Sequence, residues 1–149
     1  MANKKTLPPT YLLSFILLIA LLHYLVPVVE IIPYPWQLIG CIPLLIGIIF
    51  NLVADKALKT FNTTVKPFKE STALVTSGIY GISRHPMYLG MVLMLLGLAI
   101  LAGSLSPFLA IPVFVILMET VFVKVEEAML EKKFGIAWLE YKAKVRRWI

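Results

Sequence analysis

WQLIGCIPLLIGIIFNLVA, residues 36–54, contains no charged side chain. A transmembrane helix needs about 20 mostly apolar residues, so this run is long enough to cross a bilayer once. Similar runs cover residues 11–29 and about 107–123, and a shorter one covers 87–102. The sequence therefore predicts an all-α integral membrane protein with four transmembrane helices, arranged as two hairpins and followed by a cytoplasmic C-terminal helical segment.

The composition supports a membrane protein of one domain. The chain has 149 residues, of which 60% are hydrophobic, and its mean hydropathy is +0.89. Soluble domains average about 45–50% apolar residues. The first run, about 19 residues long, exceeds the roughly 7–15 residues of a signal-peptide core, so we expect an uncleaved helix. Residues 1–149 are expected to form one domain, with a first helical hairpin at 1–54 and a second region at 55–149.

The positive charges indicate how the chain is oriented in the membrane. All 14 Lys and Arg residues lie before the first run, between residues 55 and 86, or after the fourth run. The short turns around 33–35 and 103–107 carry none. The positive-inside rule then places both termini and the 55–86 loop in the cytoplasm. The basic residues follow the membrane ends, so the net charge of +6 favours contact with anionic lipid over nucleic-acid binding.

The stretch GISRHPMYLG, residues 81–90, places charged side chains directly before an apolar run. Pro86 suits the first position of a helix, so the third helix is expected to begin there. The free N–H groups of Met87, Tyr88 and Leu89 would then form an anion-binding helix end, with Arg84 and His85 beside it. In the alternative interpretation, the two basic side chains simply extend to lipid phosphates.

Glu119 lies inside the fourth apolar run, where carboxylates are rare and usually face the bundle interior. Glu126 follows seven residues later and is expected on the same face, whereas Glu127 is rotated by about 100°. The sequence thus predicts a ladder of Glu119 and Glu126 descending into the bundle. The alternative is that Glu126, Glu127 and Glu131 form surface ion pairs with Lys132 and Lys133. A carboxylate ladder next to an anion-binding helix end suits a zwitterionic ligand.

Other polar and small residues favour structural roles. His23 is expected to make a core hydrogen bond, because two histidines and one cysteine are too few for a dedicated transition-metal site. Gly40 and Gly47, like Gly90 and Gly97, are seven residues apart and share a helix face. Small residues on one face allow membrane helices to approach closely, so these glycines are expected to pack helices together.

Two segments, STALVTSGIYGISRHPMYLG at 71–90 and VEEAMLEKKFGIAWLEYKAKV at 125–145, carry the motifs G-x-Y-x-x-x-R-H-P-x-Y-x-G and E-E-x-x-L-x-x-x-F-G-x-x-[YW]-x-x-Y. Over about residues 61–149 the chain resembles the isoprenylcysteine carboxyl methyltransferase and phospholipid methyltransferase superfamily of membrane enzymes. The resemblance implies methyl transfer from S-adenosylmethionine to a lipophilic acceptor. It also implies that the cofactor binds between the two motifs at the cytoplasmic boundary.

The resemblance assigns the cofactor contacts residue by residue. The residues that match the family's cofactor contacts are Ala73, Leu74, Val75, Tyr80, His85, Pro86, Met87, Tyr88 and Glu126. In this interpretation the start of the third helix takes the methionine carboxylate and Glu126 takes the ammonium group. Leu74 and Val75 flank the adenine. Glu119 and Arg84 are the candidate catalytic residues, with Glu119 as a general base at the depth of a lipid-side acceptor.

One departure from the family pattern bears on the acceptor. Isoprenylcysteine methyltransferases carry an arginine four residues before the glutamate that matches Glu126, and it holds the substrate carboxylate. This chain has Phe122 there, and Lys124 is rotated by about 200° from that position. The resemblance therefore favours a neutral or apolar acceptor over a prenylcysteine carboxylate. The acceptor's identity and the oligomeric state stay open.

Two alternatives to a methyltransferase remain. Sterol reductases share the fold and use NADPH, but their motif resembles R-H-x-N-Y, with asparagine where this chain has Met87. They also have about ten helices, against four expected here. The chain could also be a non-catalytic membrane scaffold that retains the fold, as the phenylalanine at position 122 would permit.

Overall fold

The computed structural model describes residues 7–63 and 71–149, and every regular element in these ranges is a helix. The elements in chain order are α1 (Pro8–Leu25), the 3₁₀ turn η1 (Trp36–Gly40), α2 (Cys41–Thr60), the 3₁₀ turn η2 (Gly78–Gly81) and α3 (Pro86–Ala102). They are followed by α4 (Ser106–Met118), the π-helical η3 (Glu119–Val123), α5 (Lys124–Phe134) and α6 (Ile136–Lys144). The all-α prediction is confirmed.

Three helices in the described ranges are long and apolar enough to cross a membrane. They are Pro8–Leu25, Trp36–Thr60 and the continuous helix Ser106–Phe134, which comprises α4, η3 and α5. The remaining apolar helix, α3, has 17 residues and is shorter than a typical span. The protein is thus an integral membrane protein, with three such helices among its described residues.

Prolines and glycines account for the helix ends. The first helix was expected at 11–29 but covers Pro8–Leu25, because Pro8 suits its first turn. It ends before Pro27, since a residue that precedes proline disfavours helical geometry. The third helix begins at Pro86, as predicted, and ends at Ala102. The next residue, Gly103, has a φ of +76°, which suits a residue without a side chain. The second continues to Thr60, six residues beyond the expected end at Ala54.

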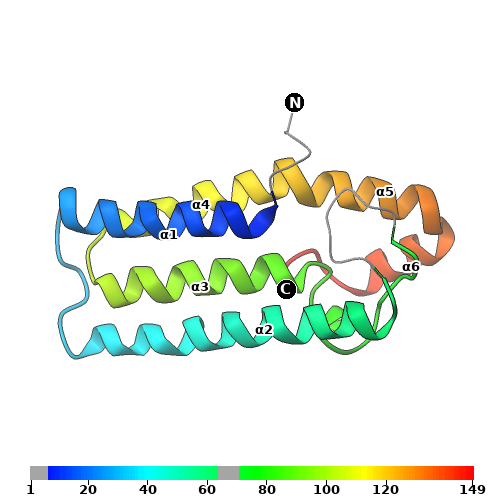
Figure 1. Cartoon of the computed structure of the whole chain (residues 1–149), viewed down its shortest axis with the longest axis horizontal. Coiled ribbons are helices and arrows are strands. Elements are labelled where there is room, and N and C mark those ends of the chain that lie inside the picture. Colours follow the sequence, from blue (N-terminus) through cyan, green and yellow to red (C-terminus); the bar gives the residue numbers. More distant parts are fainter. Residues whose placement is uncertain (1–6, 64–70) are drawn as a thin grey trace.

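Helices α1 and α2 were expected to form the first hairpin, but they do not pack along each other. Helix α3 lies between α1 and α2, packing along α2 on one side and against α1 and α4 on the other (Figure 1). The glycines make the α2–α3 contact possible, as predicted. A Cβ atom on Gly40 would come within 2.5 Å of the Gly97 carbonyl oxygen, and a Cβ on Gly47 would overlap the Gly90 carbonyl.

The main hydrophobic core lies between α1, α3 and the Ser106–Phe134 helix. Its fully buried members are Leu95, Phe114, Met118 and Val123. At the end of the bundle that holds the α1–η1 connection, His23 Nδ1 lies 2.8 Å from Ser104 Oγ. The hydrogen bond expected for His23 is therefore present.

The opposite end of the bundle brings distant segments together. The start of α1, the end of α2, the start of α3 and helices α5 and α6 all lie there (Figure 1). Among the basic residues expected at this end, Lys4, Lys5, Lys66 and Lys69 lie outside the described residues. The two segments that carry the quoted motifs meet at this end.

Candidate functional site

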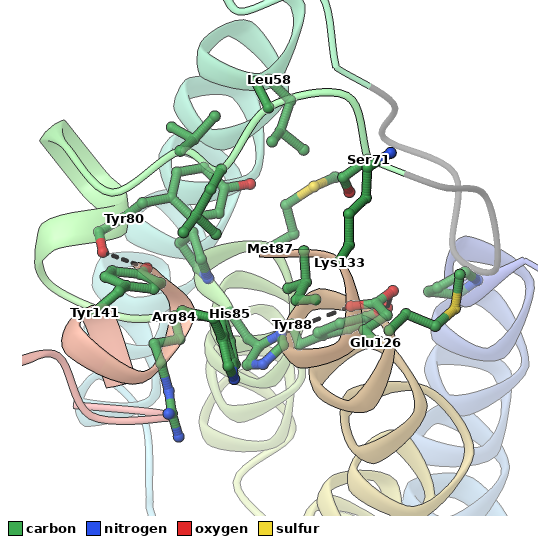
Figure 2. A pocket seen from close by; sticks show the side chains of 18 of the residues that line it. Leu58, Ser71, Tyr80, Arg84, His85, Met87, Tyr88, Glu126, Lys133 and Tyr141 are labelled. Carbon is green, nitrogen blue, oxygen red and sulfur yellow. Dashed lines mark hydrogen bonds and ion pairs between the residues drawn. The ribbon is translucent and has the colours of Figure 1, made fainter. Parts of the chain in front are cut away.

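A cavity of about 730 Å³ opens at this end of the bundle (Figure 2). Its walls come from the start of α1, the end of α2, residues 71–75, η2, the start of α3, and helices α5 and α6. Every residue that was expected to contact the cofactor lines it: Ala73, Leu74, Val75, Tyr80, His85, Pro86, Met87, Tyr88 and Glu126. The fold thus brings both motifs to one cavity.

Hydrogen bonds fix the wall formed by residues 71–80. The Thr72 hydroxyl donates to the Asn62 carbonyl at 2.8 Å, and the Thr72 amide donates to Thr63 Oγ1 at 3.1 Å. The Tyr141 hydroxyl donates to the Tyr80 carbonyl at 2.6 Å. Burial raises the pKa of Tyr141 to about 12, and burial also raises the pKa of Tyr80. Both phenols therefore stay protonated and neutral.

The start of α3 forms another part of the wall. The Leu89 amide donates to the His85 carbonyl at 3.0 Å, so the prediction that Leu89 would offer a free N–H is wrong. A helix leaves its first N–H groups without an intrahelical acceptor, which applies to Met87 and Tyr88. The His85 amide donates to Ser83 Oγ at 3.2 Å, which fixes the chain just before Pro86.

A polar cluster lies where α3 meets α5. The Tyr88 hydroxyl donates to Glu126 Oε1 at 2.7 Å, and His85 Nδ1 lies 3.7 Å from Glu126 Oε2. The other ring nitrogen, His85 Nε2, lies 3.3 Å from Glu127 Oε1. The imidazole is 5% exposed and sits between two carboxylates. Glu126 lines the cavity. Glu127, at the other ring nitrogen, is not among the described residues that line it.

Arg84 belongs to the buried side of this cluster. Its Nη2 lies 3.1 Å from Glu127 Oε1, and its guanidinium carbon lies 5.6 Å from the centre of the Trp138 ring. The side chain is 7% exposed, and its guanidinium points away from Met87 and Lys133 (Figure 2). Although Arg84 lines the cavity, its charge is directed towards Glu127.

The predicted ladder of Glu119 and Glu126 is wrong. Glu119 instead shares a partner with Glu127: Arg147 Nη1 lies 2.6 Å from Glu119 Oε1, and Arg147 Nη2 lies 2.7 Å from Glu127 Oε2. The cause is η3, because a π-helical turn takes up one extra residue and rotates everything after it. Glu119 is not among the described residues that line the cavity.

Arg147 is the member of this cluster that sequence reasoning missed. Its charge was interpreted only as part of the basic C-terminus, since nothing in the segment VRRWI indicates which of two adjacent arginines turns inward. Its side chain is 31% exposed, whereas Arg146 is exposed. Hydrogen bonding to Glu127 raises the pKa of Arg147, so the guanidinium is charged.

Phe122 is almost fully buried, with 1% of its surface exposed. Its ring centre lies 5.5 Å from that of Tyr11 in an edge-to-face contact and 6.2 Å from that of Tyr88 in a stacked one. The position at which the resembling methyltransferases carry an arginine is therefore part of an aromatic layer next to the polar cluster.

The chain is similar to several curated proteins. It is 35% identical over 112 residues to the protein-S-isoprenylcysteine O-methyltransferase of Saccharomyces cerevisiae, covering 72% of this chain and 46% of that protein. It is 31% identical over 134 residues to protein-S-isoprenylcysteine O-methyltransferase A of Arabidopsis thaliana, covering 84% of this chain and 66% of that protein. A Delta(14)-sterol reductase of Methylotuvimicrobium alcaliphilum is 37% identical over 81 residues, or 52% of this chain and 18% of the reductase.

This chain spans about half to two thirds of the length of the two methyltransferases that it matches. The family model described as phospholipid methyltransferase matches residues 36–137, which include the first motif and the E-E pair. The chain therefore belongs to the phospholipid methyltransferase family.

Proposed function

We propose that this protein transfers a methyl group from S-adenosylmethionine to a lipophilic acceptor at the cytoplasmic boundary of the membrane. The observation that carries the proposal is the convergence of both motifs on one cavity of about 730 Å³ with a carboxylate and a helix start in its wall. Cavities of about 300–1,000 Å³ are typical for small molecules and cofactors.

The chemistry of the lining fits S-adenosylmethionine. Glu126 offers a carboxylate to the ammonium group, and the first-turn N–H groups of Met87 and Tyr88 suit a carboxylate. Leu74 and Val75 offer apolar surface to the adenine ring. When bound, the cofactor would supply a methyl group on a sulfonium, which is electrophilic without further activation.

The protein's contribution to such a reaction would be orientation and the exclusion of water. Tyr88 and His85 hold Glu126 in place, and many of the other residues that line the cavity are apolar. The pairing of Glu119 with Arg147 supports a structural role for Glu119 over the general base expected from its depth. The contact of Arg84 with Glu127 likewise supports a positioning role for Arg84.

The acceptor is proposed to be lipophilic and to lack a carboxylate at the position that the aromatic layer covers. Apolar side chains of the α1 start, α3 and α5 line the cavity: Leu7, Pro8, Met91, Met129 and Leu130. Phe122 offers no charge to a substrate carboxylate. A lipophilic acceptor in the cavity would contact these apolar side chains.

We also propose how the chain sits in the membrane. Helix α3 would be a fourth, short span, and both termini would lie in the cytoplasm. The positions of three lysines support this orientation. Lys56 and Lys59 lie near the end of α2, and Lys124 begins α5, at the cavity end of the bundle. Residues 55–149 would form the catalytic region, completed by the start of α1.

Incubation of the purified protein with methyl-labelled S-adenosylmethionine and a lipid extract of the host tests the proposal. We expect label in a lipid product, and strongly reduced labelling with His85→Ala. Cofactor binding without turnover on lipid, thiol or quinone acceptors would favour the scaffold interpretation.

The similarity to a sterol reductase supports one alternative, a membrane reductase that uses NADPH. The two functions differ in the cofactor that the cavity selects. Binding of NADPH in preference to S-adenosylmethionine would reverse their order.

A further inference from the structure

We propose that Arg147, in the C-terminal segment 145–149, is a positioning residue for the cofactor cavity, holding Glu127 so that Glu127 in turn holds His85. The inference rests on the proposed function, because it concerns the site in which that cofactor would bind. Arg147 lies beyond residues 36–137, the part of the chain that matches the family model.

Arg147 forms ion pairs with two carboxylates on the Ser106–Phe134 helix. Its Nε and Nη2 contact the two oxygens of Glu127 at 3.1 and 2.7 Å, and its Nη1 contacts Glu119 at 2.6 Å. A bidentate guanidinium–carboxylate pair fixes the plane of the carboxylate as well as its position. The π-helical η3 allows one guanidinium to pair with both carboxylates, because it places Glu119 and Glu127 on the same side of the helix.

The segment that carries Arg147 is attached to the residues just before α3. The Ser83 hydroxyl donates to the Arg147 carbonyl at 3.1 Å, and the Arg84 amide donates to the Arg146 carbonyl at 3.1 Å. Trp148 packs against the main hydrophobic core. The C-terminal segment therefore joins α3 to the Ser106–Phe134 helix beside the polar cluster.

Glu127 links Arg147 to His85, which lines the cavity. The same oxygen, Oε1, that contacts Arg147 Nε lies 3.3 Å from His85 Nε2, and His85 Nδ1 faces Glu126 in the cavity wall. The Glu127 side chain is 9% exposed, so water is poorly placed to replace a lost partner. Without Arg147, the carboxylate keeps Arg84 but loses the contacts that fix its plane. Arg147 itself is not among the described residues that line the cavity.

The experiment compares Arg147→Gln with Lys144→Gln, which removes one positive charge from an exposed position nearby. Both proteins are placed in lipid nanodiscs, and the affinity for S-adenosylmethionine is measured by calorimetry. We expect Arg147→Gln to weaken binding by roughly 10- to 100-fold, by analogy with residues that orient metal-binding side chains. Lys144→Gln should bind like the wild type. Wild-type affinity in Arg147→Gln contradicts the inference.

A second readout needs no ligand. The chain has 2 histidines, so ¹⁵N-histidine NMR spectra resolve His85 from His23 once His23→Gln assigns them. We expect the ring signals of His85 to shift in Arg147→Gln and those of His23 to stay in place. Unchanged His85 signals contradict the inference. If the wild type does not bind S-adenosylmethionine, the proposed function fails, and these signals still test the positioning role.

Three further variants guard against an unfolded Arg147→Gln protein and against a general loss of stability: Arg147→Lys, Glu127→Gln and the double variant Glu127→Gln/Arg147→Gln. Arg147→Lys keeps the charge but cannot form the bidentate pair, so an intermediate affinity is expected, and wild-type affinity with unmoved His85 signals contradicts the inference. If Arg147 acts through Glu127, adding Arg147→Gln to Glu127→Gln should weaken binding less than it does in the wild type. Additive losses contradict a route through Glu127.

Discussion

Replacing Glu126 with glutamine removes the charge that is proposed to receive the cofactor's ammonium group and preserves the shape of the side chain. Glutamine can still accept the hydrogen bond that Tyr88 donates at 2.7 Å, so the cavity wall should stay in place. A hydrogen bond to a charged group contributes about 1.5–3 kcal/mol net. We therefore expect S-adenosylmethionine to bind roughly 10- to 150-fold more weakly, at 1.4 kcal/mol per factor of ten.

Calorimetry in lipid nanodiscs measures this change. Glu131→Gln is the matched control, because it removes the same charge from the same helix at a side chain that is 49% exposed. The control should bind like the wild type. A folded Glu126→Gln protein with an affinity within about twofold of the wild type would refute the assignment of Glu126 to the ammonium group.

Three other variants test particular contacts. Tyr88→Phe removes the donor that orients Glu126, and we expect roughly 5- to 10-fold weaker binding of S-adenosylmethionine by calorimetry; unchanged affinity would show that this bond does not matter. Gly47→Leu forces a side chain against the Gly90 carbonyl, so the thermal midpoint in detergent should fall, by an amount equivalent to about 1–3 kcal/mol, whereas Leu52→Ala on the exposed face of α2 should leave it nearly unchanged. Tyr141 has a pKa of about 12 in the folded protein against about 10 in an unfolded chain, so its contribution to stability is complete below pH 10 and is lost as the pH rises towards 12. Tyr141→Phe should therefore flatten the fall in thermal midpoint over this pH range, and an identical profile in both proteins would count against that shift.

The helices could be predicted from the sequence because a bilayer demands long apolar runs and proline marks where they begin. Pro86 set the start of α3 correctly, and the glycine pairs indicated the contact that α2 and α3 make. The arrangement of the helices was less accessible. A positive-inside pattern says which ends lie together but not which helices touch, so the position of α3 between α1 and α2 had to come from the structure.

The cavity was predictable at the level of its lining because the two motifs name their own residues. The ion pairs beside the cavity could not be predicted, as Glu119 illustrates. Helical spacing assigned it to the face of Glu126, but a single π-helical turn moved it to the face of Glu127. No residue in ETVFV, residues 119–123, predicts a π-helical turn. Arg147 escaped notice for a related reason, since its role depends on how the chain returns after α6.

Photolabelling with methyl-labelled S-adenosylmethionine, followed by peptide mapping, tests most directly the claim that this cavity holds the cofactor. We expect label in peptides that contain residues 71–90 and 126–141, suppressed by excess unlabelled S-adenosylmethionine and unaffected by NADPH. Label confined to other parts of the chain, or label displaced by NADPH at low concentration, would contradict it.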